Sequence, residues 1–409
     1  MSVASEITRL QNAKSALATS IGNKGVTVPA STTLDGYSAL VDQIQTGGGG
    51  GTADDGVWHR PSNWPDYTKI PMSGIGTSEV YLTYDCRYAK AGLEPKAIAI
   101  RAYATGGYDV ERGYIGNSGF VAVTQQHLTS SSVFFEYLPT NEGDFVVYRV
   151  TASNDIENFS LDDKDNYTGN QRLYAYNQPV VEMYGKLEDS VSCNMGGNGT
   201  IVSFAVSLKS VASFKNFFIN GYSLEYVDAS LIDTSSATTF EGMFNLCTSL
   251  KHIDVSDWDT GEVTTFKLMF NSCYNLREID VSDWDTSKLT DTYCMFRMCY
   301  KLTCEIDLSG WDMSLVTNTT SMFGSVNVPA IHMPSDLTVV SASTFDSTRW
   351  CTVYIFDSTT PPISANKNMF NNINTSAKIY VPDNSVNDYK TASNWSNWAS
   401  YIYRISDLT

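Results

Sequence analysis

Aspartate recurs at fixed intervals in the second half of the chain, where its carboxylates could do chemistry as groups. The positions are the D-x-D pairs Asp257/Asp259 and Asp283/Asp285 and a separate column of Asp254, Asp280 and Asp307. Stacked carboxylates repel one another unless they accept backbone N–H bonds or bind a cation. The pattern therefore predicts either Asp-capped turns or a calcium site, and it predicts no other cofactor.

Tryptophan accompanies these aspartates at one aligned position, occupied by Trp258, Trp284 and Trp311. Exposed indoles in a row would offer flat faces to sugar rings, whereas buried indoles would form the edge of a core. Both interpretations stay open from the sequence. The three tryptophans and the four D-x-D aspartates are the candidate receptor-binding residues.

The element that must position these side chains is a repeat. Met-Phe pairs end at Phe244, Phe270, Phe296 and Phe323, which are 26, 26 and 27 residues apart. Each of the first three is followed by Cys-x-x-Leu and then Ile-Asp-Val or Ile-Asp-Leu. A fixed period in this range predicts a solenoid of stacked units, each with one short strand and one helical turn. We count seven units and expect the cysteines to be buried, apolar thiols.

The remaining chain is divided by composition. Apolar runs at 80–84, 97–103, 145–150 and 180–184, separated by Gly, Asn, Asp and Pro, predict an antiparallel β-sandwich. The predicted class is mainly β with short helices. The domains are a helical docking segment at 1–46, a Gly linker at 47–51, the sandwich at 52–200, the solenoid at 201–381 and a C-terminal cap at 382–409.

Two short amphipathic helices are expected in the first segment. Their apolar stripes are Ile7, Leu10 and Leu17, and Tyr37, Leu40 and Ile44. Each stripe is too short to be stable alone, and the pair can hardly bury a core by itself. We therefore expect these residues to dock the helices on each other or on other chains.

Charge and motifs exclude several functions. The net charge is −17, with no basic stripe, which argues against nucleic acid and anionic membranes. No 18-residue apolar window predicts membrane insertion, and charged residues near the N-terminus interrupt any secretory signal. The chain has no H-E-x-x-H, G-x-S-x-G or P-loop motif, so we expect no enzyme.

Two stretches resemble known families. The unit Met-Phe-x-x-Cys-x-x-Leu…Ile-Asp-Val-Ser-Asp-Trp-Asp-Thr resembles BspA-type leucine-rich repeats of bacterial surface proteins, strongly over 215–325 and weakly to 381. That resemblance implies a leucine-rich-repeat solenoid that binds host surfaces, and it transfers no catalytic residue. The start, Ile7-Thr-Arg-Leu-Gln-Asn-Ala-Lys14 and onward to Tyr37, is similar to the N-terminal segment of phage and prophage tail proteins.

Together the resemblances imply a phage tail fibre or baseplate-tip protein. Such a protein is assembled in the host cytoplasm, is located in the tail of the virion and works as a homotrimer. Its N-terminus would bind tail or baseplate proteins, and its C-terminal repeats would bind a host glycan or protein. Two alternatives remain: a bacterial cell-surface adhesin with the same repeats, or a polysaccharide depolymerase tail spike that uses paired carboxylates.

Overall fold

The computed structural model describes residues 61–86, 97–129, 132–137, 145–161, 180–188, 192–194, 200–364 and 367–408. The chain divides into two compact units, Met1–Trp64 and Pro65–Thr409. The first unit is almost entirely outside the described residues. The predicted helix pair, with Ile7, Leu10, Leu17, Tyr37, Leu40 and Ile44, therefore lies outside them too.

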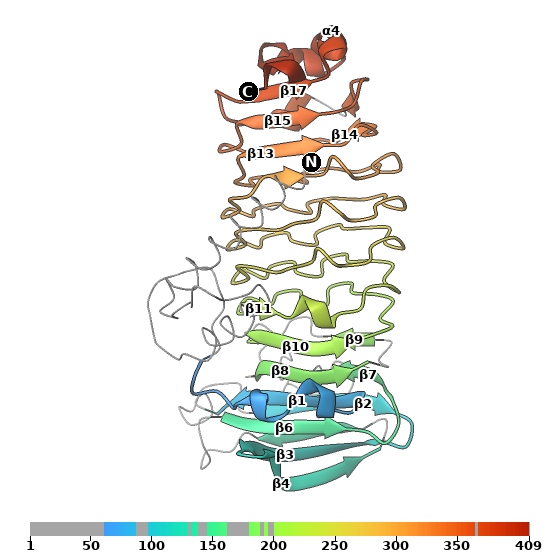
Figure 1. Cartoon of the computed structure of the whole chain (residues 1–409), viewed down its shortest axis with the longest axis vertical. Coiled ribbons are helices and arrows are strands. Elements are labelled where there is room, and N and C mark those ends of the chain that lie inside the picture. Colours follow the sequence, from blue (N-terminus) through green and yellow to red (C-terminus); the bar gives the residue numbers. More distant parts are fainter. Residues whose placement is uncertain are drawn as a thin grey trace, which may run out of the picture. The chain divides into compact units, whose positions relative to one another are not determined.

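Two facing sheets begin the second unit (Figure 1). In order, the seven-stranded sheet contains β11 (Tyr226–Val227), β10 (Ser203–Leu208), β8 (Val180–Leu187), β1 (Ser78–Asp85), β6 (Phe145–Thr151), β3 (Tyr108–Gly116) and β4 (Gly119–Leu128). The four-stranded sheet contains β5 (Val133–Tyr137), β2 (Ala97–Ala104), β7 (Ile156–Ser160) and β9 (Ser192–Asn194). Most pairs are antiparallel, but β10 pairs in parallel with both β8 and β11, and β7 with β9.

Alternation along β1 explains how this sheet buries both faces. Val80, Leu82 and Tyr84 point into the main core together with side chains of β2 and β6. The intervening Tyr81 belongs to a second, smaller cluster on the opposite face. There Tyr67, in the 3-10 turn Tyr67–Lys69, stacks on Tyr184 with ring centroids 4.8 Å apart. Successive side chains of β1 thus point to opposite faces, and the face opposite the main core carries Tyr81 among the polar residues Glu79, Thr83 and Asp85.

The repeats follow, each stacked on the one before it (Figure 1). The aligned phenylalanines form a continuous file from Phe218 to Phe370, with neighbouring ring centroids 4.8–6.0 Å apart and nearly parallel planes. Cys247, Cys273 and Cys299 are fully buried. Their thiols donate to the carbonyls of Phe218, Phe244 and Phe270 in the preceding coil at 3.2–3.3 Å. The prediction of buried, apolar cysteines is confirmed.

The Met-Phe turns provide the backbone bonds between coils. Around Phe244, the N–H groups of residues 242, 244 and 246 donate to the carbonyls of Lys267, Met269 and Asn271 in the next coil. Residues two before and two after the Phe have positive φ, as at Leu268 (59°) and Ser272 (62°). With these two positive-φ residues, every second N–H of the turn points to the next coil, and this turn replaces the helical turn that we expected from the sequence.

Further strands occur only toward the C-terminal end of the repeats. They are β12 (Ile306–Asp307), β13 (Ala330–Met333), β15 (Val353–Phe356), β17 (Lys378–Val381) and β18 (Ile402–Arg404), all parallel, and the pair β14 (Val339–Val340) and β16 (Ile363–Ser364). Between β11 and β12, where every residue is described, the chain forms no strand and only isolated bridges such as Thr265–Asp291.

The predicted fold class is therefore wrong. We expected an N-terminal helix pair, an antiparallel sandwich and a leucine-rich-repeat solenoid with one strand in each unit. The described chain is mainly β in several sheets. The seven- and four-stranded sheets are mixed, the five-stranded sheet is parallel, and the central repeats contribute no strand. The seven-stranded sheet also continues into the first repeat through β11. The predicted domain boundaries within the second unit stay predictions.

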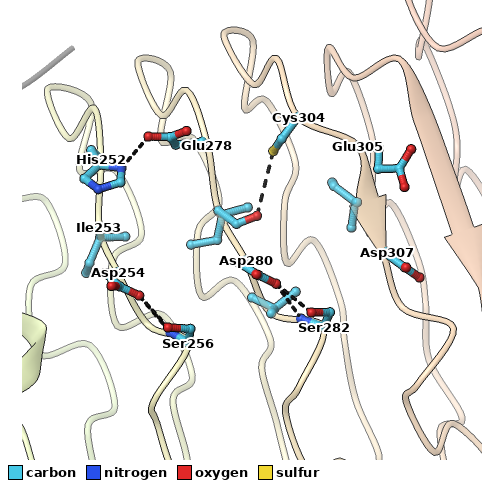
Figure 2. A pocket seen from close by; sticks show the side chains of 13 residues that line it. His252, Ile253, Asp254, Ser256, Glu278, Asp280, Ser282, Cys304, Glu305 and Asp307 are labelled. Atoms are coloured by element: carbon cyan, nitrogen blue, oxygen red, sulfur yellow. Dashed lines mark hydrogen bonds and ion pairs between the residues drawn. The ribbon is translucent and has the colours of Figure 1, made fainter. Parts of the chain in front are cut away.

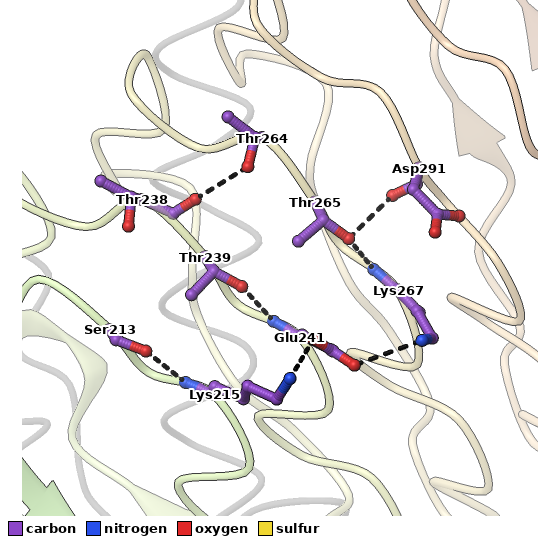
Figure 3. A network of polar contacts seen from close by, with 9 residues as sticks. All are labelled: Ser213, Lys215, Thr238, Thr239, Glu241, Thr264, Thr265, Lys267 and Asp291. Carbon is purple, nitrogen blue, oxygen red and sulfur yellow. Dashed lines mark hydrogen bonds and ion pairs between the residues drawn. The ribbon is translucent and has the colours of Figure 1, made fainter.

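Polar side chains line another side of the coils (Figure 3). Glu241 lies between Lys215 and Lys267, with N–O distances of 2.7 and 3.3 Å. The bond from Lys215, reinforced by Lys267, holds the pKa of Glu241 below its usual range despite partial burial. Thr264 and Thr290 each donate to the carbonyl of the aligned threonine one coil earlier. These columns fix the register between coils.

The C-terminal end closes the core. Helix α4 (Val386–Thr391) and the 3-10 segment Trp395–Tyr401 pack beyond β17. Trp395 is fully buried against Phe356 and Phe370, and its indole N–H donates to the carbonyl of Pro362 at 2.8 Å. None of the helices among the described residues is both long and apolar enough to cross a membrane.

Candidate functional site

A groove of about 620 Å³ crosses three successive coils at the position of the Ile-Asp-Val segments (Figure 2). It is lined by residues 252–254 and 256, 278–282, and 304–307. Ile253, Ile279 and Ile306 are buried and form its apolar floor, and the side chains on either side are mostly carboxylates. Because each coil contributes the same segment, the groove presents similar groups at the interval of the coils.

The aspartate column Asp254, Asp280 and Asp307 lies in this groove. Asp254 accepts bonds from the backbone N–H and the hydroxyl of Ser256 at 3.2 and 2.7 Å, and Asp280 accepts the same pair from Ser282 at 3.0 and 2.7 Å. The bonds from Ser256 hold the pKa of Asp254 below its usual range. All these bonds reach Oδ1. The carboxylates are therefore fixed in place while Oδ2 can accept bonds from a ligand.

Asp307, at the end of the column, is held in a similar way. Burial opposes its ionisation, but the bonds from Ser309 and the nearby His332 still hold its pKa below the usual range. His332 Nδ1 is 3.5 Å from Asp307, and its Nε2 is 2.8 Å from Asp357 in a later coil. The histidine thus joins the carboxylates of two coils next to the groove.

The other rim of the groove contains His252, Glu278, Cys304 and Glu305 (Figure 2). His252 Nδ1 lies 3.0 Å from Glu278 Oε1 in the next coil. Burial raises the pKa of the Cys304 thiol, which points at the carbonyl of Ile279. A thiol with a raised pKa is a poor nucleophile. The serine hydroxyls of the lining donate to aspartates, so the groove residues form no Ser–His pair. Groups suited to binding dominate it.

The predicted aromatic platform is wrong. Trp258, Trp284 and Trp311 are buried, with exposed fractions of 7%, 2% and 3%. Their indole N–H groups donate to the carbonyls of Ala229, Val255 and Val281 in the preceding coil at 3.2, 3.0 and 2.8 Å. They form the edge of the core, which is the other interpretation left open by the sequence.

The D-x-D aspartates lie outside the groove. Asp259 accepts from the N–H of Gly261 at 3.2 Å and Asp285 from that of Ser287 at 3.0 Å, so both cap turns. The bonds from Ser287 lower the pKa of Asp285. Asp257 and Asp283 are exposed, and each directly precedes a buried tryptophan in the sequence. In the described part of the chain no three His, Cys, Asp or Glu side chains are grouped to hold a metal ion. Receptor binding by these aspartates stays a prediction.

The sequence singled out the aspartate column of the groove, but as capped turns or a calcium site. It placed receptor binding on tryptophans and D-x-D aspartates that do not line the groove, and it missed the rim. The column of Asp254, Asp280 and Asp307 was recognised from its repeat position. Glu278, two residues before Asp280, has His252 and Glu305 at the same offset from their own aspartates. That offset was the available signal. The sequence pattern does not make the rim evident, because the three residue types at this offset differ.

Part of the chain matches a known protein family. Residues 212–332 are similar to a family described as "Mycoplasma protein of unknown function, DUF285". The matched residues include the whole lining of the groove but less than half of the chain. No curated protein matches the chain.

Proposed function

We propose that the chain is a component of a phage tail fibre or baseplate tip that attaches to the host cell surface through its repeats. The observation that carries the proposal is the groove, in which three successive coils contribute equivalent side chains. The proposal also draws on the resemblance of residues 7–37 to phage tail proteins. An assembly of three chains belongs to the same proposal, because several weak sites on one particle raise avidity.

The groove favours recognition of an extended partner. Its aspartates are held by turn bonds before any ligand arrives, so little side-chain entropy is lost on binding. Equivalent groups recur coil by coil, which suits a partner with its own repeat. The absence of a nucleophile–base pair among the lining residues gives no support to an enzymatic role for the groove.

Cell binding tests the groove. The variant Glu278→Gln/Asp280→Asn removes two charges, and Asn retains the oxygen that caps the turn. We expect full-chain protein carrying both changes to bind host cells at least tenfold more weakly in flow cytometry. The matched control is Asp388→Asn, an exposed carboxylate of helix α4 outside the groove, which should bind as the unmodified protein does. Equal binding by both variants would remove the groove from the proposal.

A bacterial cell-surface adhesin is the second candidate. The similarity of residues 212–332 to a family described as Mycoplasma protein favours a cellular protein. Peptide mass spectrometry of purified virions and of washed bacterial surfaces separates the two. Peptides of the chain in virions support the tail component, whereas peptides on cells that release no phage support the adhesin.

A further inference from the structure

A column of aromatic side chains follows one corner of the repeat stack. Between each Met-Phe turn and the groove segment, most coils make a two-residue turn, at 222–223, 248–249, 274–275, 300–301, 349–350 and 375–376. We call these the corner turns. Four of the six contain a large aromatic residue: Tyr222, Tyr274, Tyr300 and Trp350.

The exposure of these rings is what distinguishes the column. Tyr222, Tyr300 and Trp350 are 50%, 44% and 71% exposed. Among the described residues 210–380, they are the only aromatic side chains with this degree of exposure, although the same stretch buries many Phe and Trp rings. Single exposed aromatic residues are ordinary on a protein surface, but exposed aromatic residues at equivalent positions of several repeats are not a random distribution. Tyr274, which is half-buried, stacks on Tyr300 with ring centroids 5.4 Å apart.

Tyr300 stacks on Tyr274 and the Tyr222 hydroxyl donates to Asn220 Oδ1, but packing in the main core does not account for this corner. The main core is filled by the Phe file, and neither Tyr222, Tyr300 nor Trp350 belongs to it. In the sequence, two of the rings are adjacent to residues that can donate hydrogen bonds: Lys301 follows Tyr300, and Arg349 precedes Trp350. A flat apolar ring beside polar donors suits a ligand that is itself apolar on one face and hydroxylated at its rim.

Three corner turns, at 248–249, 274–275 and 300–301, lead into segments that line the groove, whereas Tyr222 and Trp350 lie in coils before and after it. Tyr274 precedes the groove residue Glu278 by four residues, and Tyr300 precedes Cys304 by four. Four residues span at most about 14 Å. A ligand as long as a short oligomer could therefore contact the rings with one part and the fixed carboxylates with another.

We infer that the corner turns and the groove together bind an uncharged glycan, with the rings of Tyr222, Tyr300 and Trp350 as stacking surfaces. This inference rests on the proposed host-surface function and names its ligand class. A sugar ring has an apolar C–H face for the aromatic ring and hydroxyls for the aspartates. A polyanion is disfavoured by the net charge of −17 and by the acidic groove. The carboxylates alone would suit a cationic peptide, but such a ligand would leave the aromatic column unexplained.

Binding of the full chain to defined oligomers tests the inference. The probes are immobilised neutral oligosaccharides of glucose, galactose, rhamnose and N-acetylglucosamine, with heparin and oligolysine as charged comparisons. We expect binding to at least one neutral oligosaccharide, and at least tenfold weaker binding by Tyr222→Ser/Tyr300→Ser/Trp350→Ser. Tyr300→Phe keeps the ring and should bind nearly as well as the unmodified chain. Ile363→Ser, at an exposed apolar residue away from the corner turns, is the matched control.

The outcomes separate this inference from the proposed function. Binding only to heparin or only to oligolysine, or neutral binding that survives the triple substitution, overturns the glycan assignment. Cells that are bound equally before and after periodate, which destroys vicinal diols, also overturn it while leaving host attachment intact. The opposite outcome is glycan binding that depends on the column, while the protein binds no host cell and is absent from virions. That outcome retains the inference and removes the tail function. Circular dichroism of each variant checks that the fold persists.

Discussion

At the scale of single residues, the buried indoles show how polar atoms are accommodated inside a stack of coils. Trp284 is 2% exposed, and its N–H donates to the carbonyl of Val255 in the preceding coil. Trp284→Phe keeps an aromatic ring but leaves that carbonyl without its donor, which should lower the free energy of unfolding by about 1–3 kcal/mol. Urea unfolding of the full chain measures it. Trp350→Phe, at an exposed site, should change the free energy of unfolding by less than about 0.5 kcal/mol. Equal effects of the two substitutions would contradict the stabilising role of the Trp284 hydrogen bond.

The capping aspartates predict acid sensitivity. The bonds from Ser256 and Ser287 hold the pKa values of Asp254 and Asp285 below the ordinary 3.8. The stability that they contribute is present above the unfolded pKa and is lost as pH falls through the folded pKa. The melting temperature should therefore fall below about pH 4. Asp254→Asn/Asp285→Asn keeps the capping oxygens without the titration, so its melting temperature should fall less steeply. Parallel curves for both proteins would contradict this.

At the scale of the element, the Met-Phe turn depends on two residues with positive φ. Gly242 has φ of +66°, and an added Cβ would collide with Oδ1 of Asn216 in the preceding coil. Leu268 and Ser321 occupy the same position in other coils, so the backbone itself tolerates a side chain there. Gly242→Ala should cost about 1–3 kcal/mol, more than the roughly 1 kcal/mol expected from backbone conformation alone.

A double-mutant cycle distinguishes collision from strain. Asn216→Ser removes the offending oxygen, and serine is found at this position before Phe323 and Phe345. In the Asn216→Ser background, Gly242→Ala should cost clearly less. Gly74→Ala, where an added Cβ meets nothing within 4 Å, serves as the neutral comparison. Thermal unfolding followed by circular dichroism measures all four variants. An unchanged cost in the Asn216→Ser background would assign the effect to backbone strain.

These elements also explain what sequence could predict. The period located the buried Phe, Cys and Leu positions, because equivalent residues of stacked units must share an environment. It could not reveal that the coils join through turns with two positive-φ residues, since Leu268 and Ser272 carry no signal for positive φ. Nor could it predict that β8 pairs in parallel with β10, because alternation looks alike in either direction. The corner tyrosines were missed because their exposure depends on which way each turn faces.

At the scale of the whole described unit, one core continues from Val80 in the first sheet to Ile402 near the C-terminus. Each coil contacts its neighbours, so stability depends on terms between adjacent units and on closure of the ends. Trp395 provides that closure at one end. Trp395→Ala should lower the free energy of unfolding by about 3–5 kcal/mol, as expected for loss of a large buried ring.

The continuity of the core is tested by measuring whether the stability lost in Trp395→Ala is also lost at the far end of the core. Cys86 is buried in the sheet region and Cys351 near the cap, and burial raises the pKa of Cys351 to about 12. Both thiols should resist labelling until the core opens. If the core is one cooperative unit, mass spectrometry of thiol labelling against temperature should show both becoming reactive together, at a lower temperature in Trp395→Ala. Labelling of Cys351 well before Cys86 in that variant would mean that the terminal coils unfold separately, and the cap would then protect only its neighbours.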